Sequence, residues 1–160
     1  MDRRGIAVET MTRPSTLALV TLTALSACKI LVPAGTSLLT FEVREVNWDP
    51  PSPQIVLFVS DDKTYSCLNF QIDNELIVHD HSIRVAMSGA VTAPNVCLTA
   101  IGPAQIRSPL PIAEGTYTLE FARAGVTDRY RLAVTASAIL IFPIEARFTR
   151  PTALRFARGA

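Results

Sequence analysis

Local motifs that identify an enzyme are missing from this chain of 160 residues. It has no Gly-x-Ser-x-Gly nucleophile elbow, no His-Glu-x-x-His zinc motif and no glycine-rich phosphate-binding loop. No segment repeats at a fixed period, and no amphipathic helical pattern is longer than one short N-terminal stretch. These absences favour a structural or binding module over an enzyme, so we expect neither catalytic residues nor a cofactor.

An excess of charge of either sign is also missing. From residue 28 onward the chain carries 12 Lys and Arg against 12 Asp and Glu, whereas nucleic-acid binding depends on a basic surface. We therefore expect no nucleic-acid partner. The one asymmetry is a basic C-terminal tail at residues 147–160, whose arginines are Arg147, Arg150, Arg155 and Arg158. This tail either contacts anionic lipid head groups or another anionic polymer of the cell envelope, or is a solvated chain end.

Cysteine is scarce, with three in the chain. Neither Cys67 nor Cys97 belongs to a Cys-x-x-Cys motif or has a nearby partner ligand, so a zinc site is not expected. In an oxidising compartment such a pair is a disulfide candidate. The bond would close a loop of roughly 30 residues and contribute roughly 3 to 4 kcal/mol in the chain-entropy model. The alternative is two free buried thiols.

A hydrophobic run of transmembrane length is missing too. Leu17–Leu25 is apolar apart from two threonines and follows Arg13, but Lys29 ends the run well before the roughly 20 residues that a spanning helix needs. Positive charge, an apolar segment and small residues in this order are typical of a cleavable export signal, which we expect to be helical. Met11 offers a more conventional start, so residues 1–10 are either an over-long start or an extended positive region.

The tetrapeptide Leu25-Ser26-Ala27-Cys28 ends this segment. It resembles the lipobox of bacterial lipoproteins, in which small residues precede the cysteine that receives a diacylglycerol. The resemblance implies that residues 1–27 are a removed signal peptide and that Cys28 becomes the first mature residue, anchored by acyl chains such as palmitate. Lys29 stands where an Asp retains such proteins at the inner membrane, which implies the outer membrane, on its periplasmic or surface side, if the cell has two. The alternative is an ordinary signal peptide with an incidental cysteine.

Alternation of apolar and polar residues dominates the rest of the chain. We divide it into a tether at residues 28–37, a β domain at 38–146 and the basic C-terminal tail. A slip of phase at Arg44-Glu45 predicts a β-bulge, and three prolines predict irregular structure at 102–111. The expected strands lie at 39–48, 55–59, 65–72, 76–78, 83–87, 96–101, 117–121, 130–134 and 139–144, with turns at 73–74 and 123–125. About eight or nine short strands separated by turns are typical of an all-β sandwich or barrel.

Gly115 and Tyr117 stand two residues apart before one of these strands. This spacing resembles the corner before the penultimate strand of immunoglobulin-like and fibronectin type III domains. The resemblance implies a Tyr117 hydroxyl bonded to the preceding loop, in a small antiparallel β-sandwich of immunoglobulin type. The chain departs from that pattern because Leu119 stands where immunoglobulins place a cysteine, and because Cys67 and Cys97 do not follow their disulfide spacing.

His79 and His81 are the weak metal-ligand candidates. In a strand they would share a face and could bind one metal ion, but no third ligand stands at a recognisable spacing, and the alternative is an exposed polar turn around Asp80. Asp61-Asp62 is either a pair of calcium ligands or a solvated turn. Four aromatic residues form either a sugar-binding platform or part of the core: Trp48, Tyr65, Tyr117 and Tyr130.

These features together predict a membrane-anchored, exported lipoprotein that serves as a non-catalytic structural or binding module of the cell envelope. Its expected partners are membrane lipid through Cys28 and an envelope protein or anionic polymer. The alternative functions are a periplasmic ligand carrier with an apolar cleft and a metal-binding protein that uses His79 and His81.

Overall fold

The computed structural model describes residues 37–47 and 53–159 of the chain. All of them belong to one compact unit, Pro33–Ala160. The predicted signal peptide, the lipobox with Cys28 and the tether up to residue 36 lie outside the described residues, as does Trp48. Within the described residues, no helix is long and apolar enough to cross a membrane.

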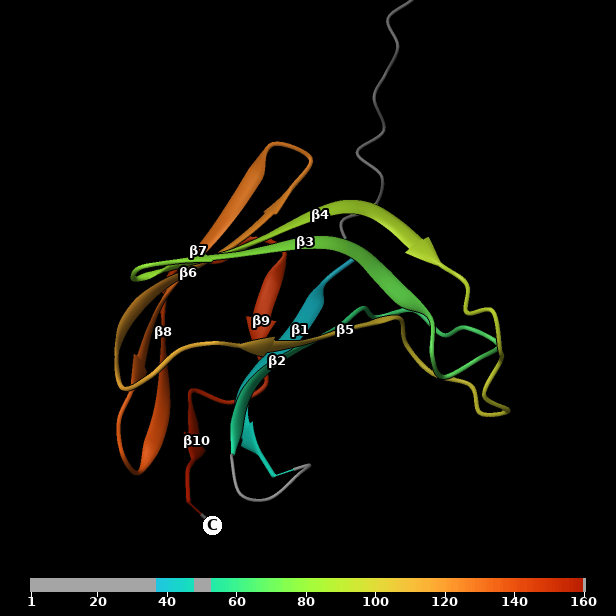
Figure 1. Cartoon of the computed structure of the whole chain (residues 1–160). Coiled ribbons are helices and arrows are strands. Elements are labelled where there is room, and N and C mark those ends of the chain that lie inside the picture. The colour runs from blue at the N-terminus through green and yellow to red at the C-terminus, as the bar shows by residue number, and fades with distance from the viewer. Residues whose placement is uncertain (1–36, 48–52, 160) are drawn as a thin grey trace, which may run out of the picture. The chain divides into compact units, whose positions relative to one another are not determined.

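Strands build the described part of the chain, and the predicted all-β class is confirmed (Figure 1). Every second side chain is buried along most of β1, β6 and β7, as the period-two pattern predicts. The ten strands are β1 (Leu39–Val46), β2 (Gln54–Ser60), β3 (Gln71–His79), β4 (Ser82–Thr92), β5 (Gln105–Leu110), β6 (Gly115–Arg123), β7 (Val126–Val134), β8 (Ala138–Glu145), β9 (Thr149–Pro151) and β10 (Arg155–Ala157).

One continuous sheet contains these strands, in the order β10-β8-β7-β6-β4-β3-β5-β2-β1-β9. Most neighbouring pairs are antiparallel, but β4 with β6, β3 with β5 and β1 with β9 are parallel. The sheet is therefore mixed, which corrects the expectation of antiparallel strands alone. Parallel neighbours require crossover connections, and intervening strands together with the loop at 93–104 supply them here.

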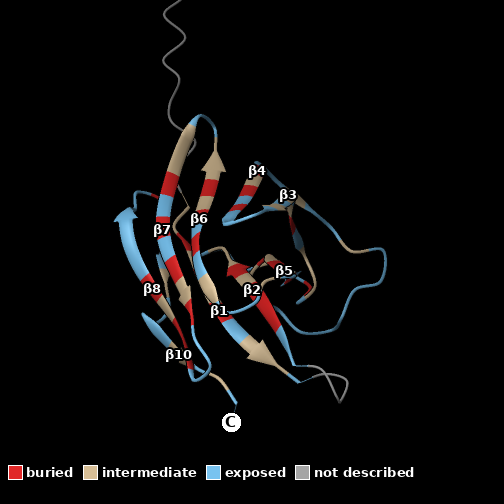
Figure 2. Cartoon of the chain, turned by 60° about the vertical axis from the view of Figure 1, so that its left-hand side comes forward, coloured by how far each residue is buried: buried red, intermediate tan, exposed pale blue. Residues whose placement is uncertain are grey.

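The sheet curls until its two halves face each other. The ring of Phe41 in β1 lies 4.7 Å from that of Phe121 in β6 and 4.8 Å from that of Tyr130 in β7, measured between ring centroids. Four strands separate β1 from β6 in the sheet order, so only curling brings these rings together. Buried residues of both halves, coloured red in Figure 2, form one hydrophobic cluster. The single sheet therefore encloses a sandwich-like core.

The end of the chain joins the two edges of the curled sheet. β9 pairs with β1 at one edge, and β10 pairs with β8 toward the other, although only residues 152–154 lie between them. The Thr152 N–H donates to the Phe41 carbonyl, and the Leu154 carbonyl accepts from Ile141. We call residues 147–159 with these contacts the closed seam. The prediction of a solvated tail at 147–160 is corrected, because these residues complete the sheet.

Asp128 of β7 fixes the entry to the closed seam. Its carboxylate is fully buried and accepts hydrogen bonds from the backbone N–H groups of Arg147, Phe148 and Thr149 at 2.7 to 2.9 Å, and from the Thr149 hydroxyl at 2.7 Å. The Tyr130 hydroxyl donates to the Thr149 carbonyl at 2.8 Å, and burial raises the pKa of Tyr130. A buried carboxylate requires such donors, so this network holds the turn before β9 in one conformation.

Glu45 explains why no bulge forms at Arg44-Glu45. β1 pairs with β2 in unbroken register from Thr40 to Val46, so the predicted bulge is wrong. The carboxylate of Glu45 takes the position that continues the inward side of the strand and accepts from Arg158 Nε at 2.7 Å. The guanidinium of Arg158 lowers the pKa of Glu45. Glu45, the polar residue that interrupts the alternation of apolar and polar residues, is therefore paired with Arg158 near the C-terminal end of the chain.

Four local predictions fail around one loop region. Residues 65–70 and 96–101, expected as strands, lie outside the named strands, whereas 105–110 is β5 despite its proline. The turn expected at Asp73-Asn74 is instead a register shift within β3. A disulfide joins the loops at 65–70 and 96–101 and holds their apolar residues outside the sheet. β5 pairs with β2 instead.

The hairpin of β6 and β7 agrees with the sequence pattern. Its turn places Ala124 at φ 48° and Gly125 at φ 79°, a pair of left-handed conformations that matches the right-handed twist of the strands. The predicted corner bond is also present. The Tyr117 hydroxyl donates to the Ala113 carbonyl at 3.1 Å and accepts from the Ala113 N–H at 3.2 Å, while its ring is buried.

Candidate functional site

A groove separates β3 from β5 where the curled sheet is least tightly joined. The two strands share a single residue pair, Gln71 with Gln105, and the Gln105 N–H donates to the Phe70 carbonyl at 2.9 Å. The groove holds about 470 Å³, and the core residues Ile72 and Ile106 line it. Its remaining lining residues are Leu68, Asn69, Phe70, Gln71, Asn74, Leu98, Gln105, Arg107 and Ser108. We call this place the open seam.

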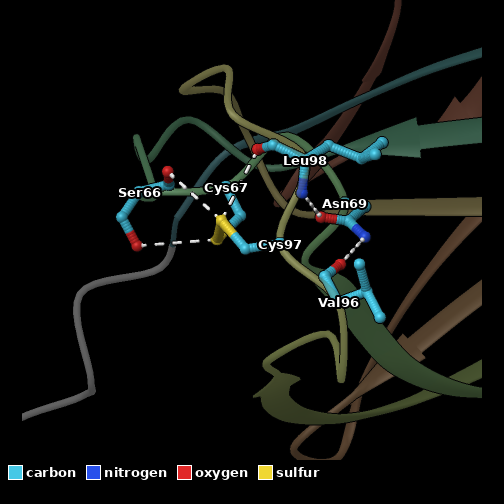
Figure 3. Close-up of a disulfide and its surroundings, with 6 residues drawn as sticks. All are labelled: Ser66, Cys67, Asn69, Val96, Cys97 and Leu98. Carbon is cyan, nitrogen blue, oxygen red and sulfur yellow. Dashed lines mark hydrogen bonds between the residues drawn. A yellow bond between two sulfur atoms is a disulfide. The ribbon is translucent and has the colours of Figure 1, made fainter.

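Two loops at one end of the open seam are joined into a single body, which we call the stapled tip (residues 65–70 and 93–104). The predicted partners Cys67 and Cys97 are joined by a disulfide, with Cα atoms 5.3 Å apart (Figure 3). Asn69 adds two bonds to the second loop, donating to the Val96 carbonyl at 2.8 Å and accepting from the Leu98 N–H at 3.2 Å. The loops are thus fixed to each other by both covalent and polar contacts.

The base of the stapled tip is tied to the sheet. Tyr65 and Gly102 exchange backbone hydrogen bonds of 2.8 and 3.2 Å. The Tyr65 hydroxyl donates to the Asp61 carboxylate at 2.7 Å, and the other oxygen of Asp61 accepts from the Ala104 N–H at 2.9 Å. Burial and this carboxylate raise the pKa of Tyr65 to about 12. Asp61, a calcium-ligand candidate, therefore uses both oxygens to hold the loops in place.

Apolar side chains project from the stapled tip into solvent. The exposed fractions are 74 % for Val96, 72 % for Ile101, 53 % for Leu98 and 40 % for Leu68. The apolar pattern at 96–101 suggests a strand, and the structure shows an exposed surface instead. The sequence signal that marks this surface is the complete absence of charged residues at 64–72 and 85–106.

The two histidines flank a tight turn and make separate contacts. His79 ends β3 and lies 3.0 Å from the Asp80 carboxylate, whereas His81 Nδ1 lies 3.0 Å from the Thr116 carbonyl. Asp80 has a positive φ of 49°, and residues 79–81 are exposed around a turn, so the alternative of an exposed polar turn is confirmed and the two rings do not share a strand face. Among the described residues, no three His, Cys, Asp or Glu side chains are grouped to hold a metal ion.

The predicted aromatic platform is divided between core and loop. Tyr117 and Tyr130 are buried, and Tyr65 stacks on Phe70 with 4.8 Å between ring centroids. A second cavity, near Pro53 and Pro109, holds about 600 Å³ but is wider open to solvent, and Arg158 at its edge is paired with Glu45. Core residues line both cavities, but the groove at the open seam is the more enclosed of the two.

No family model, curated protein or solved structure matches the chain. Its function is therefore argued from the chemistry of the open seam and the stapled tip. Apolar residues supply area for contact, amide side chains and backbone groups supply neutral hydrogen bonds, and Arg107 is the one charged residue in the lining. The lining is therefore mostly apolar and neutral.

Proposed function

We propose that the chain is an exported lipoprotein, anchored through Cys28 on the envelope membrane, that acts as a non-catalytic binding module. The groove at the open seam is its binding site. The lipobox and the preceding apolar segment support the anchor, and Lys29 supports an outer-membrane location in a cell with two membranes. The Cys67–Cys97 pair supports export, since disulfides persist in oxidising compartments.

The observation that carries binding is the groove itself. Its volume of about 470 Å³ falls in the range of ligand pockets, roughly 300 to 1,000 Å³. The buried core residues Ile72 and Ile106 line it together with the amide side chains of Asn69, Gln71 and Gln105, and Arg107 is its one charged lining residue. Such a mostly neutral lining fits an envelope protein segment that offers both apolar side chains and backbone hydrogen-bonding groups.

A second candidate is a carrier of a small apolar ligand. The same groove favours it, because Leu68, Phe70 and Leu98 add apolar surface around the two core residues. Native mass spectrometry of the protein purified from the envelope separates the candidates. A bound lipid-sized mass favours the carrier, and an empty protein favours the binding module.

Acylation tests the anchor. Cys28→Ser should give an unprocessed precursor that takes up no labelled fatty acid, because the only thiol that can receive the lipid is gone. Normal labelling of this variant would refute the lipoprotein assignment. The matched control is the double variant Cys67→Ser with Cys97→Ser, which leaves Cys28 intact and should be acylated normally.

Photo-crosslinking tests the groove. A photoreactive side chain at Gln71, an exposed groove residue, should give an adduct in intact envelopes, whereas one at Thr118, an exposed residue of β6, should give none. A protein-sized adduct supports the binding module. Equal adducts at both positions, or none at either, would contradict a binding site at the open seam.

A further inference from the structure

The stapled tip exposes an unusual amount of aliphatic surface on a rigid support. Val96, Leu98 and Ile101 are each more than half exposed. The disulfide and the bonds of Asn69 hold the loop that carries them, so these side chains are presented without further ordering of the backbone. Exposed apolar clusters of this kind mark sites of contact with protein or membrane.

The absence of charge favours a membrane. Residues 64–72 and 85–106 contain no Asp, Glu, Lys or Arg, although charged residues make up 18 % of the chain. Side chains that enter the acyl region of a bilayer must be uncharged, because ionised groups are costly there. Protein-binding hot spots are instead enriched in Trp, Tyr and Arg, and the large exposed apolar residues of the tip are all Val, Leu or Ile.

The start of the described chain lies at the same end of the molecule as the base of the tip. The Ser37 carbonyl accepts from Arg123, and Ser37 lines a small cavity together with Lys63, Tyr65 and Val91. The chain between the predicted lipid on Cys28 and Ser37 can extend over at most about 30 Å, at 3.3 to 3.6 Å per residue. An anchor at Cys28 would therefore keep this end of the sheet close to the bilayer.

We infer that the stapled tip is a second membrane contact, which inserts Val96, Leu98 and Ile101 into the boundary between lipid head groups and acyl chains. The inference rests on the proposed anchor, because it is the short tether that brings the tip to the surface. The acyl chains proposed on Cys28 would hold the domain at the membrane without orienting it, and an inserted tip would fix that orientation. The open seam would then lie beside the bilayer, where a membrane-embedded partner could reach it.

Tryptophan fluorescence on vesicles tests this contact. The sheet and its core lie within residues 37–159, so the chain from Lys29 onward contains the complete domain. With an N-terminal polyhistidine tag it can be captured on phosphatidylcholine vesicles that contain a nickel-chelating lipid. The one tryptophan is replaced by Trp48→Phe, and a reporter is introduced either by Ile101→Trp in the tip or by Ile144→Trp in β8. The two positions are matched, since both are isoleucines exposed by 72 % and 63 %.

On capture, emission from the Ile101→Trp protein should shift to shorter wavelength and be quenched by brominated phosphatidylcholine. The Ile144→Trp protein should show neither change, and adding Leu98→Asp to the tip reporter should abolish both. Unchanged emission from the tip reporter, or equal changes at both positions, would overturn the inference. Either result would favour a protein partner as the contact of the tip. Nickel capture replaces the native lipid, so this result is independent of the acylation test at Cys28. Near-identical circular dichroism of the variants checks that all are folded.

Discussion

The two seams of the curled sheet are held by opposite means. At the closed seam, the buried carboxylate of Asp128 accepts four hydrogen bonds, and the chain end pairs with strands on both edges. At the open seam, β3 and β5 share one residue pair, and a disulfide holds the adjoining loops. Polar groups are buried at the first seam, and apolar groups are exposed at the second.

This difference separates stability from binding within one small domain. A closed ladder with satisfied polar groups resists local opening, whereas a region with few shared backbone bonds and exposed apolar surface opens at lower cost. The disulfide limits that opening at the stapled tip without filling the groove. Under the proposed function, the open seam accepts a partner while the closed seam maintains the fold.

The largest expected effect comes from breaking the closed seam. Asp128→Ala leaves the buried N–H groups of Phe148 and Thr149, the part-buried N–H of Arg147 and the Thr149 hydroxyl without their acceptor, which should cost about 3 to 5 kcal/mol of unfolding free energy. Urea denaturation of the chain from Lys29 onward measures this loss. The matched control is Asp62→Ala, an exposed carboxylate in the loop after β2, which should change stability by less than about 0.5 kcal/mol. Equal midpoints for the two variants would contradict the role of Asp128.

Removing the staple from the open seam should come next. The double variant Cys67→Ser with Cys97→Ser opens a loop of 30 residues and should cost about 3 to 4 kcal/mol in the chain-entropy model. Hydrogen exchange should show faster exchange at 93–104, with the amides of Arg147, Phe148 and Thr149 still protected under native conditions. Uniformly faster exchange at both seams would show that the two are not separate.

One hydroxyl group outside both seams, that of Tyr117, gives a reference for the size of these effects. Tyr117→Phe removes the hydroxyl that bonds Ala113 but keeps the buried ring, so it should cost about 1 to 1.5 kcal/mol. A thermal melt would show a fall of a few degrees for a domain of this length. An unchanged melting temperature would mean that the corner bond contributes nothing, despite its geometry.

The smallest effect is the pH dependence of the chain end. Arg158 lowers the pKa of Glu45 from its ordinary value of 4.5, so the ionised carboxylate stabilises the fold more than it stabilises the unfolded chain. This contribution is fully present above pH 4.5 and is lost as the pH falls through the lowered folded-state pKa. Glu45→Gln should therefore reduce the loss of stability on acidification, measured by denaturation at neutral and acidic pH. An unchanged pH profile would contradict a stabilising ion pair between Glu45 and Arg158.

The β6–β7 hairpin, the Tyr117 corner and the disulfide could be predicted from the sequence, because they depend on near neighbours or on side-chain chemistry. Alternation fixed the hairpin of β6 and β7, because a residue's burial in a strand follows from its own parity. The Gly115-Tyr117 spacing indicated the corner bond, and an even pair of cysteines after Cys28 indicated the disulfide. Each of these inferences involves residues a few positions apart or a bond that only one residue type can form.

The closed seam and the open seam could not be predicted from the sequence, because both depend on contacts between distant segments. Glu45 meets Arg158, and Asp128 meets Thr149, across distances in sequence that no local pattern encodes. The pattern at 96–101 is that of a buried strand, but a buried strand needs a partner strand. In the sheet, β5 pairs with β2 and β3, and the chain end supplies the two edge strands. The apolar pattern of a segment shows which face it could bury. Distant segments compete for the same pairing partners, and the outcome of that competition sets which of them is buried in the sheet.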